Sequence, residues 1–282
     1  MIRFGFSTLG VPGMPLRAVL DLARDTGFAG VELRCADGEP VHPGLDRAGR
    51  SAVVRAFAGS GVTPIALASY VRVAQPGPDG PVLAALRRHI WLAADIGAGC
   101  VRVFPGGGDQ PGKTADAAAV RRLRGVAGLA QTCGVRLLLE THDSHRSAEA
   151  AARVVRGVGE PGAEDPGVGV LWDVLHTHLA GDSPGRAYAA LAPCLGYIQV
   201  KDIRGPGDLT PVAPGTGALD LGSVLRTVVD AGYDGWLVWE YEAAWYPGIP
   251  ALPALLPAAR DWLERALGPA TPLPADSPAG LR

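Results

Sequence analysis

The sequence lacks the usual marks of a secreted or membrane-bound protein. Its 282 residues contain no apolar run long enough to span a bilayer, and the N-terminal MIRFGFSTLG lacks the apolar core of a signal peptide. The four cysteines are scattered and form no CxxC pair, which favours reduced thiols over a disulfide framework. We therefore expect a cytoplasmic protein that has no membrane partner.

Lysine is also scarce, and neither sign of charge dominates. The chain contains only Lys113 and Lys201, and its formal net charge is −2. No basic stripe, arm or tail offers a surface for a phosphate backbone, so nucleic acid is not an expected partner. We interpret the glycine triplet at 106–108 as a flexible loop.

Short apolar runs alternate with helical patterns eight times along the chain. The runs that predict strands are 2–7, 29–34, 62–69, 99–104, 135–140, 168–173, 197–202 and 236–240. The patterns that predict helices are 15–26, 45–60, 81–97, 114–132, 146–157, 184–192, 219–231 and 251–267. The segment 203–217, after the seventh strand, is predicted to be a long Pro/Gly loop.

Eight βα units in one run, without a change of composition, favour an α/β fold of the (β/α)₈ TIM-barrel type. We expect a single domain over residues 1–267, and a chain that is 48% hydrophobic can fill its core. An open doubly wound sheet is the alternative. Residues 268–282 carry too little apolar surface to pack and are predicted to form a disordered tail.

Oxygen-bearing side chains stand at the ends of four successive strands. Glu140 follows three leucines, Asp173 ends VGVLW, Gln199 lies within YIQVKD and Glu240 follows WLVW. Because these ends would meet at one face of a barrel, the four donors predict one metal site. A buried carboxylate is costly without a partner. The structural alternatives are rim salt bridges for the glutamates, a helix cap for the aspartate, and hydrogen bonds to polar neighbours for the glutamine.

Further polar and aromatic residues lie at the same predicted rim. His176 follows the sixth strand within reach of the same cavity, although an ordinary hydrogen-bonded rim histidine is the alternative. Lys201 shares the face of Gln199 by period-two alternation, and a local ion pair with Asp202 is its alternative. The aromatic residues near strands six and eight could form the wall of a sugar pocket. The candidate substrate-binding residues are Glu32, Arg34, His142, Lys201, Glu242 and Trp245.

In order, the motifs LLLETHD, LWDVLH, YIQVKD and GWLVWEYE resemble the xylose isomerase-like TIM-barrel family, the sugar phosphate isomerases/epimerases, over about residues 2–267. The resemblance implies one divalent metal held by Glu140, Asp173, position 199 and Glu240. Most members have histidine where this chain has Gln199, but an amide oxygen can also bind a metal, as in the hydroxypyruvate-isomerase branch that this arrangement resembles. An all-oxygen ligand set binds Mn²⁺ or Mg²⁺ better than Zn²⁺. We expect Mn²⁺ first, with Mg²⁺ or Co²⁺ as alternatives.

The resemblance also implies a metal-dependent isomerase or epimerase that acts through an enediolate on a keto-sugar or related polyol. Glu140 and Glu240 would move the α-proton, and His176 would hydrogen-bond a substrate oxygen. The alternative is a lyase or dehydratase, including a C-glycoside-cleaving type, that uses the same metal site on a keto-sugar or cyclitol. A DNA-repair endonuclease of this superfold would need more histidines than the six present. A non-catalytic sugar-binding or scaffold protein is the last alternative.

The expected partner is a small-molecule carbohydrate, and the formation of a homo-oligomer is left open. No Gly-rich phosphate cradle opens a helix after strands seven or eight, and the acidic and aromatic stretch YEAAWYP follows strand eight. These features predict a non-phosphorylated substrate. The alternative is a phosphate clamp built from cations on other loops, namely Arg34, Arg102, Lys201 and Arg204.

Overall fold

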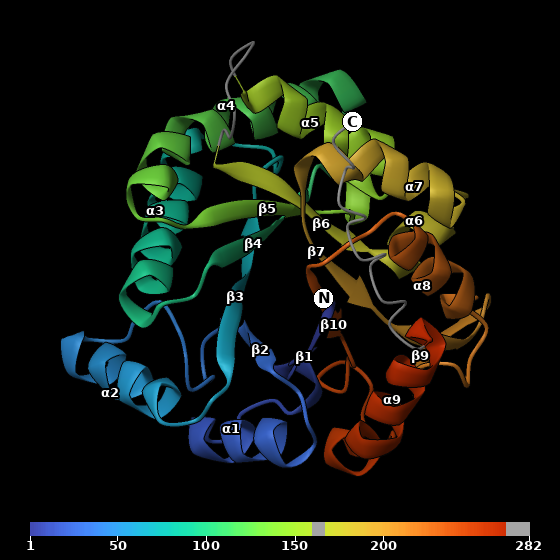
Figure 1. Ribbon diagram of the computed structural model, residues 1–282. Helices are drawn as coiled ribbons and strands as arrows, with labels where there is room; N and C mark the ends of the chain where they lie inside the picture. Colours follow the sequence, from blue (N-terminus) through green and yellow to red (C-terminus); the bar gives the residue numbers. More distant parts are fainter. Residues whose placement is uncertain (160–166, 269–282) are drawn as a thin grey trace, which may run out of the picture.

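The computed structural model describes residues 1–159 and 167–268, in which eight parallel strands close into a barrel surrounded by helices (Figure 1). Around the barrel the order is β1-β10-β7-β6-β5-β4-β3-β2. The closed order confirms the predicted (β/α)₈ barrel and rules out the open doubly wound sheet. The barrel strands are β1 (Arg3–Ser7), β2 (Gly30–Arg34), β3 (Thr63–Arg72), β4 (Cys100–Phe104), β5 (Arg136–Glu140), β6 (Val168–Asp173), β7 (Leu195–Val200) and β10 (Trp236–Trp239).

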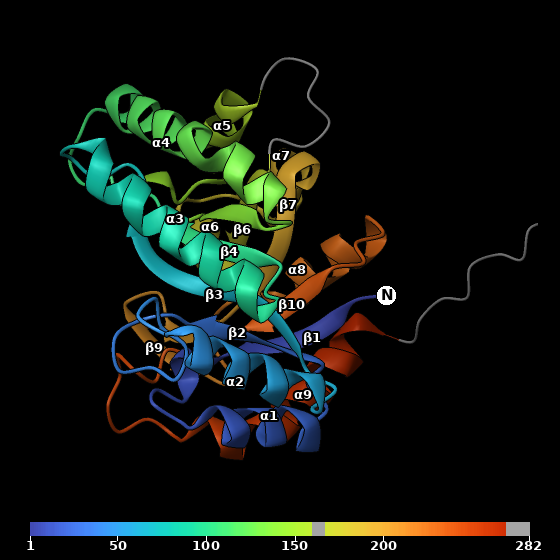
Figure 2. The same cartoon turned by 90° about the vertical axis from the view of Figure 1, so that its left-hand side faces the viewer.

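Helices cover the outside of the strands, and α1 to α4 lie one beside the next in the side view (Figure 2). Their apolar faces explain this placement, because buried residues recur at helical spacing, as at Val19, Leu20 and Ala23 of the first helix. The α-helices are α1 (Leu16–Asp25), α2 (Arg47–Ala58), α3 (Asp79–Ile96), α4 (Gly112–Thr132), α5 (Ala148–Val158), α6 (Val174–Leu179), α7 (Pro184–Leu191), α8 (Leu221–Asp230) and α9 (Leu252–Leu267). Short 3₁₀ turns occupy Thr8–Gly10, Asp143–His145 and Ala192–Cys194.

The interior of the barrel is filled by large side chains and is not a pore. A small apolar cluster inside it contains Ile65, Leu138, Tyr197 and Trp236, and a much larger one lies between strands and helices. The crowding requires glycine on some strands. A Cβ added at Gly30 would lie 2.8 Å from side-chain atoms of both Ile65 and Trp236. This packed layer forms the floor beneath the polar end of the barrel.

Period-two alternation raises polar side chains above that floor. Leu138 is followed on the same face by Glu140, and Tyr197 by Gln199. The strand register then brings donors from different strands together, because Asp173 of β6 pairs with Gln199 of β7. The C-terminal ends of the strands therefore form a layer of buried polar groups.

The segment after β7 differs from the expected loop. It contains an antiparallel hairpin, β8 (Asp202–Gly205) and β9 (Asp208–Val212), that turns through Pro206 and Gly207. Beyond the hairpin, the buried carboxylate of Asp202 accepts hydrogen bonds from the backbone N–H groups of residues 215, 217 and 219 at 2.9–3.1 Å. The prediction of a long loop was wrong for the part that forms the hairpin, and Asp202 anchors the chain that follows it.

The helix α6 is a second element that the sequence did not predict. It follows β6 directly, and the Asp173 carboxylate accepts hydrogen bonds from the N–H groups of Leu175, at 2.8 Å, and His176 at its start. No helix in the described residues is long and apolar enough to cross a membrane. The tail predicted for 268–282 lies, from residue 269 on, outside the described residues, so it stays a prediction.

Candidate active site

Three carboxylates converge at the C-terminal end of the barrel. Oxygens of Glu140, at the end of β5, Asp173, at the end of β6, and Glu240, directly after β10, all lie within 4.8 Å of one another. All three residues are buried. Negative charges this close repel strongly where water is excluded, so the group needs bound cations, bound protons or both.

Gln199 is fully buried beside this group of carboxylates. Its Nε2 donates hydrogen bonds to Glu32 Oε2 at 2.8 Å and to Glu240 Oε1 at 3.1 Å. Its Oε1 has no hydrogen-bond partner among the described residues. Two carboxylates therefore fix the orientation of the amide, and its oxygen is left free to accept a ligand.

Glu32 lies beneath Gln199 inside the barrel. Its Oε2 accepts hydrogen bonds from the Tyr197 hydroxyl and from Gln199, which join β2 to β7 across the interior. Burial, with the Glu240 carboxylate nearby, raises the pKa of Glu32. Glu32 therefore orients the amide of Gln199. Its expected contact with the substrate stays a prediction.

Lys201 places an ammonium group among the carboxylates. Its Nζ lies 2.7 Å from Asp173 Oδ2, forms an ion pair with Glu240 Oε2, and lies 2.9 Å from Glu242 Oε1. Burial by itself lowers the pKa of Lys201, but the three carboxylates outweigh it and raise the pKa well above its ordinary value. The lysine therefore pairs across strands, whereas Asp202, its expected alternative partner, binds the backbone of the following loop.

A second buried cation, Arg102 of β4, faces Glu140. The Arg102 Nε lies 3.2 Å from Glu140 Oε2, and the guanidinium sits 3.9 Å above the Phe104 ring. Burial raises the pKa of Glu140 to about 8, even though the charges of Arg102 and His142 oppose the shift. The sequence offered Arg102 only as part of a phosphate clamp. Its place in the middle of the apolar strand CVRVF was the signal of an inward, buried role.

Two histidines stand above Glu140 at the rim. The rings of His142 and His176 are 3.9 Å apart, and their nitrogens form with Glu140 a second group of donors within 4.8 Å. Burial, assisted by the charges of Lys201 and His142, lowers the pKa of His176 to about 2. Burial also acts to lower the pKa of His142, but the carboxylates of Asp143 and Glu140 give it a net rise. His176 is therefore neutral and can donate or accept one hydrogen bond at each nitrogen.

Aromatic rings continue along the rim as one series of contacts, which we name the aromatic arc: Trp245, Tyr70, Phe104, His142 and His176. Successive ring centroids lie 6.4, 6.0, 4.7 and 3.9 Å apart. Arg34 adjoins the arc, with its guanidinium 5.1 Å from the Trp245 ring and 2.5 Å from Glu39. Ring faces of this kind pack against the C–H faces of sugars and other flat apolar groups.

The comparisons with known proteins agree with the barrel fold. A sequence model of the family described as xylose isomerase-like TIM barrel matches residues 20–266. The chain belongs to this family. A putative hydroxypyruvate isomerase of Streptomyces coelicolor is 32% identical over 212 residues, which make up 66% of this chain and 72% of that protein.

Solved structures share the fold of this xylose isomerase-like chain at low sequence identity. The IolI protein with a bound zinc atom has a TM-score of 0.79 and 20% identity, covering 94% of this chain and 98% of that one. A D-psicose 3-epimerase from Clostridium cellulolyticum, solved with D-tagatose, has a TM-score of 0.77 and 17% identity, covering 94% and 99%. At such identities the likeness supports the fold alone.

The loop that carries His142 is anchored by residues that the sequence analysis missed. Asp143 has a positive φ of 45°, and next to it Ser144 Oγ lies 2.9 Å from His145 Nδ1. His145 is buried, and its Nε2 lies 2.8 Å from Asp116 Oδ1 on α4. Because Asp116 can only accept while ionised, Nε2 carries the proton. No periodicity or motif marks this connection, since it joins the 3₁₀ turn after β5 to a separate helix, α4.

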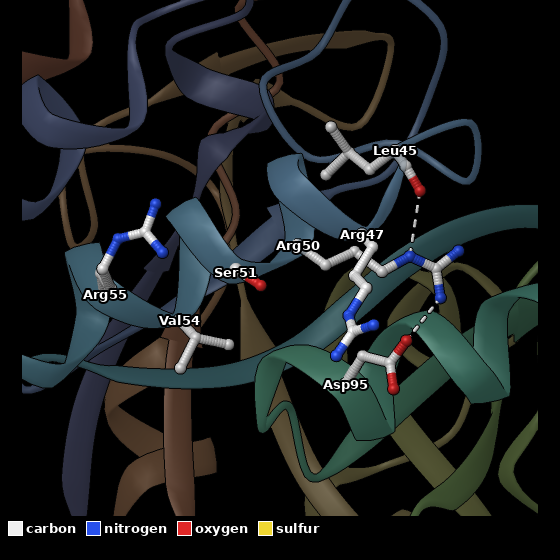
Figure 3. Close-up of a pocket in the computed structure, with 7 residues that line it drawn as sticks. All are labelled: Leu45, Arg47, Arg50, Ser51, Val54, Arg55 and Asp95. Atoms are coloured by element: carbon white, nitrogen blue, oxygen red, sulfur yellow. Dashed lines mark hydrogen bonds and ion pairs between the residues drawn. The ribbon is translucent and has the colours of Figure 1, made fainter.

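A groove of about 620 Å³ on the outside of the barrel lies apart from this chemistry (Figure 3). It runs between α2 and α3, and Arg47, Arg50 and Arg55 line it. Arg50 is already bound to Asp95 at 2.6 Å and to the Leu45 carbonyl. The groove contributes none of the grouped carboxylates, so the candidate active site is the barrel end.

Proposed function

We propose that the protein is a divalent-metal-dependent isomerase or epimerase of a non-phosphorylated keto-sugar or related polyol. The observation that carries this proposal is the meeting of Glu140, Asp173 and Glu240 at the end of a closed barrel, beside the amide of Gln199, whose oxygen has no hydrogen-bond partner among the described residues. Membership of the family and the hydroxypyruvate-isomerase relative support an enzyme of this kind.

The residues present fit a divalent ion. Three carboxylates and an unpartnered amide oxygen form a hard, all-oxygen donor set, which favours Mn²⁺ or Mg²⁺, with Co²⁺ as a further choice. A bound ion would polarise the carbonyl oxygen of the substrate. Glu140, Asp173, Gln199 and Glu240 would hold it.

Proton transfer would fall to the glutamates at the same site. One of Glu140 and Glu240 accepts the α-proton, and the electron pair of the broken C–H bond moves to the carbonyl oxygen to give an enediolate. Return of a proton to the neighbouring carbon, with transfer of the hydroxyl proton from one enediolate oxygen to the other, isomerises the sugar, whereas return to the opposite face of the same carbon epimerises it. His176, neutral in this environment, would hydrogen-bond a substrate oxygen.

The cations around the site support a substrate without a phosphate group. Each candidate of the alternative phosphate clamp already faces a carboxylate. Arg34 pairs with Glu39, Arg102 with Glu140, Lys201 with three acids, and Arg204 with Asp208 at 3.0 Å. A phosphate dianion would have to displace these partners, while the aromatic arc can pack against the C–H face of a free sugar.

The test follows the α-proton in D₂O. Protein reconstituted with Mn²⁺ would be incubated with paired free and phosphorylated ketoses, and deuterium incorporation measured by mass spectrometry. We expect exchange only with free sugars, and products of unchanged mass apart from the deuterium. Exchange restricted to phosphorylated sugars would refute the substrate class, and a product lighter by one water would favour the lyase alternative. Glu264→Gln, an exposed change on α9, is the matched control for changes at the buried glutamates.

A further inference from the structure

The ammonium of Lys201 lies on the oxygens that a metal would use. Two of its three ion-pair partners, Asp173 and Glu240, belong to the carboxylate group at the strand ends. The third, Glu242, lies outside that group. The lysine side chain is only 3% exposed, so these ion pairs are shielded from water. The ammonium of Lys201 and a divalent ion would therefore bind the same carboxylate oxygens of Asp173 and Glu240.

The two cations cannot both hold these oxygens at close range. A divalent ion bound by Asp173 and Glu240 would stand near the ammonium in a site that excludes water, where like charges repel most strongly. Without any cation, however, Asp173 and Glu240 would face each other as buried, unneutralised acids. The metal-free protein therefore needs Lys201 where it is, and the metal-bound protein needs it elsewhere.

We propose that Lys201 is a displaceable internal counter-ion, which neutralises Asp173 and Glu240 in the metal-free protein and withdraws to Glu242 when a divalent ion binds. This inference rests on the proposed metal-dependent function. Glu242 suits the second position because its side chain is 23% exposed, whereas that of Asp173 is fully buried. Withdrawal moves the ammonium toward the rim, where it can meet a substrate oxygen. Metal binding would thus be coupled to the movement of Lys201 to a position where it can contact the substrate.

Lys201→Met tests the proposal because it removes the charge but keeps much of the apolar stem. Lys113→Met is the matched control, since Lys113 is the only other lysine and is exposed at the start of α4. Mn²⁺ binding would be measured by calorimetry, and thermal unfolding would be followed in EDTA. We expect the Lys201 variant to bind Mn²⁺ roughly tenfold more tightly than wild type, and to unfold at a lower temperature when metal-free. The control should match wild type in both.

A second measurement uses the wild-type chain and does not depend on how a variant folds. Labelling lysine with ¹⁵N gives side-chain ammonium signals from only two residues. On titration with Mg²⁺, the signal of Lys201 should move and saturate with the Mg²⁺ affinity that calorimetry gives for wild type, while that of Lys113 stays fixed.

The outcomes separate this inference from the proposed function. Equal Mn²⁺ affinity of wild type and Lys201→Met, or a Lys201 signal that does not move while Mg²⁺ binds, would overturn the displacement and leave the metal-dependent function standing. Binding of Mn²⁺ to the variant but not to wild type would show that the lysine replaces the metal permanently, and would overturn both. Binding to neither protein would also overturn both.

Discussion

Metal binding at neutral pH should release close to one proton from Glu140. This carboxyl group is 1% exposed, and burial raises its pKa from 4.5 to about 8 against the opposing charges of Arg102 and His142. At pH 7, a group with that pKa is about nine-tenths protonated. A carboxylate must ionise to bind a metal. The proton should therefore leave as the ion enters.

The same shift predicts how the stability of the metal-free protein depends on pH. Because the pKa of Glu140 is higher in the folded than in the unfolded chain, the folded protein binds the extra proton between about pH 4.5 and pH 8. Its free energy of unfolding should therefore fall as the pH rises through this window. Each pKa unit corresponds to about 1.4 kcal/mol, so the complete loss would reach roughly 5 kcal/mol.

Calorimetry in buffers of different ionisation enthalpy measures the proton directly. At pH 7 we expect about 0.9 protons released per Mn²⁺ bound, and an apparent affinity that rises about tenfold per pH unit up to pH 8 and then levels off. Glu140→Gln should release far less and bind more weakly, whereas the exposed Glu264→Gln should match wild type. Release near zero in the wild type, or equal release in Glu140→Gln, would refute the reasoning.

Three further changes test the site. Glu240→Gln should lower turnover by about 10²-fold or more, because it removes a ligand charge and an acid/base group together, and near-wild-type turnover would contradict the mechanism. Gln199→His should shift metal preference toward Zn²⁺ and Co²⁺ and add pH dependence near neutrality, so unchanged preference and pH profile would place residue 199 outside the ligand set. His145→Ala should lower the free energy of unfolding in urea by about 1–3 kcal/mol, because it leaves Asp116 without a buried partner, and an unchanged midpoint would contradict that role.

The barrel could be predicted because its strands are buried on both faces. Runs such as VGVLWD have no polar interruption until the last residue, and the structure places β6 over the same six residues. The helix boundaries were also close, as for α3, predicted at 81–97 and observed at Asp79–Ile96. Local sequence determines both features, through burial pattern and helix-ending glycines such as Gly97, whose φ is 79°.

The partners of the site residues could not be predicted in the same way. Alternation places Lys201 and Gln199 on one inward face, but which carboxylates they meet depends on closure of the barrel between β6, β7 and β10. The hairpin after β7 was missed for a related reason. Its Pro/Gly-rich sequence is typical of a loop, and Asp202 anchors the chain beyond the hairpin through residues 13 to 17 positions away.

Charge balance links the proton of Glu140 to the movement of Lys201. In the metal-free protein, the formal charges of Asp173, Glu240 and Glu242 face two cations, Arg102 and Lys201, while burial favours the neutral form of Glu140. Adding a divalent ion without any other change would leave an excess of positive charge in a buried site. Ionisation of Glu140 supplies a fourth negative charge. The four negative charges then balance those of Arg102, Lys201 and the divalent ion, provided that Lys201 stays nearby on Glu242. The lysine is therefore expected to move within the site, and proton release and lysine withdrawal should share one dependence on Mg²⁺ concentration.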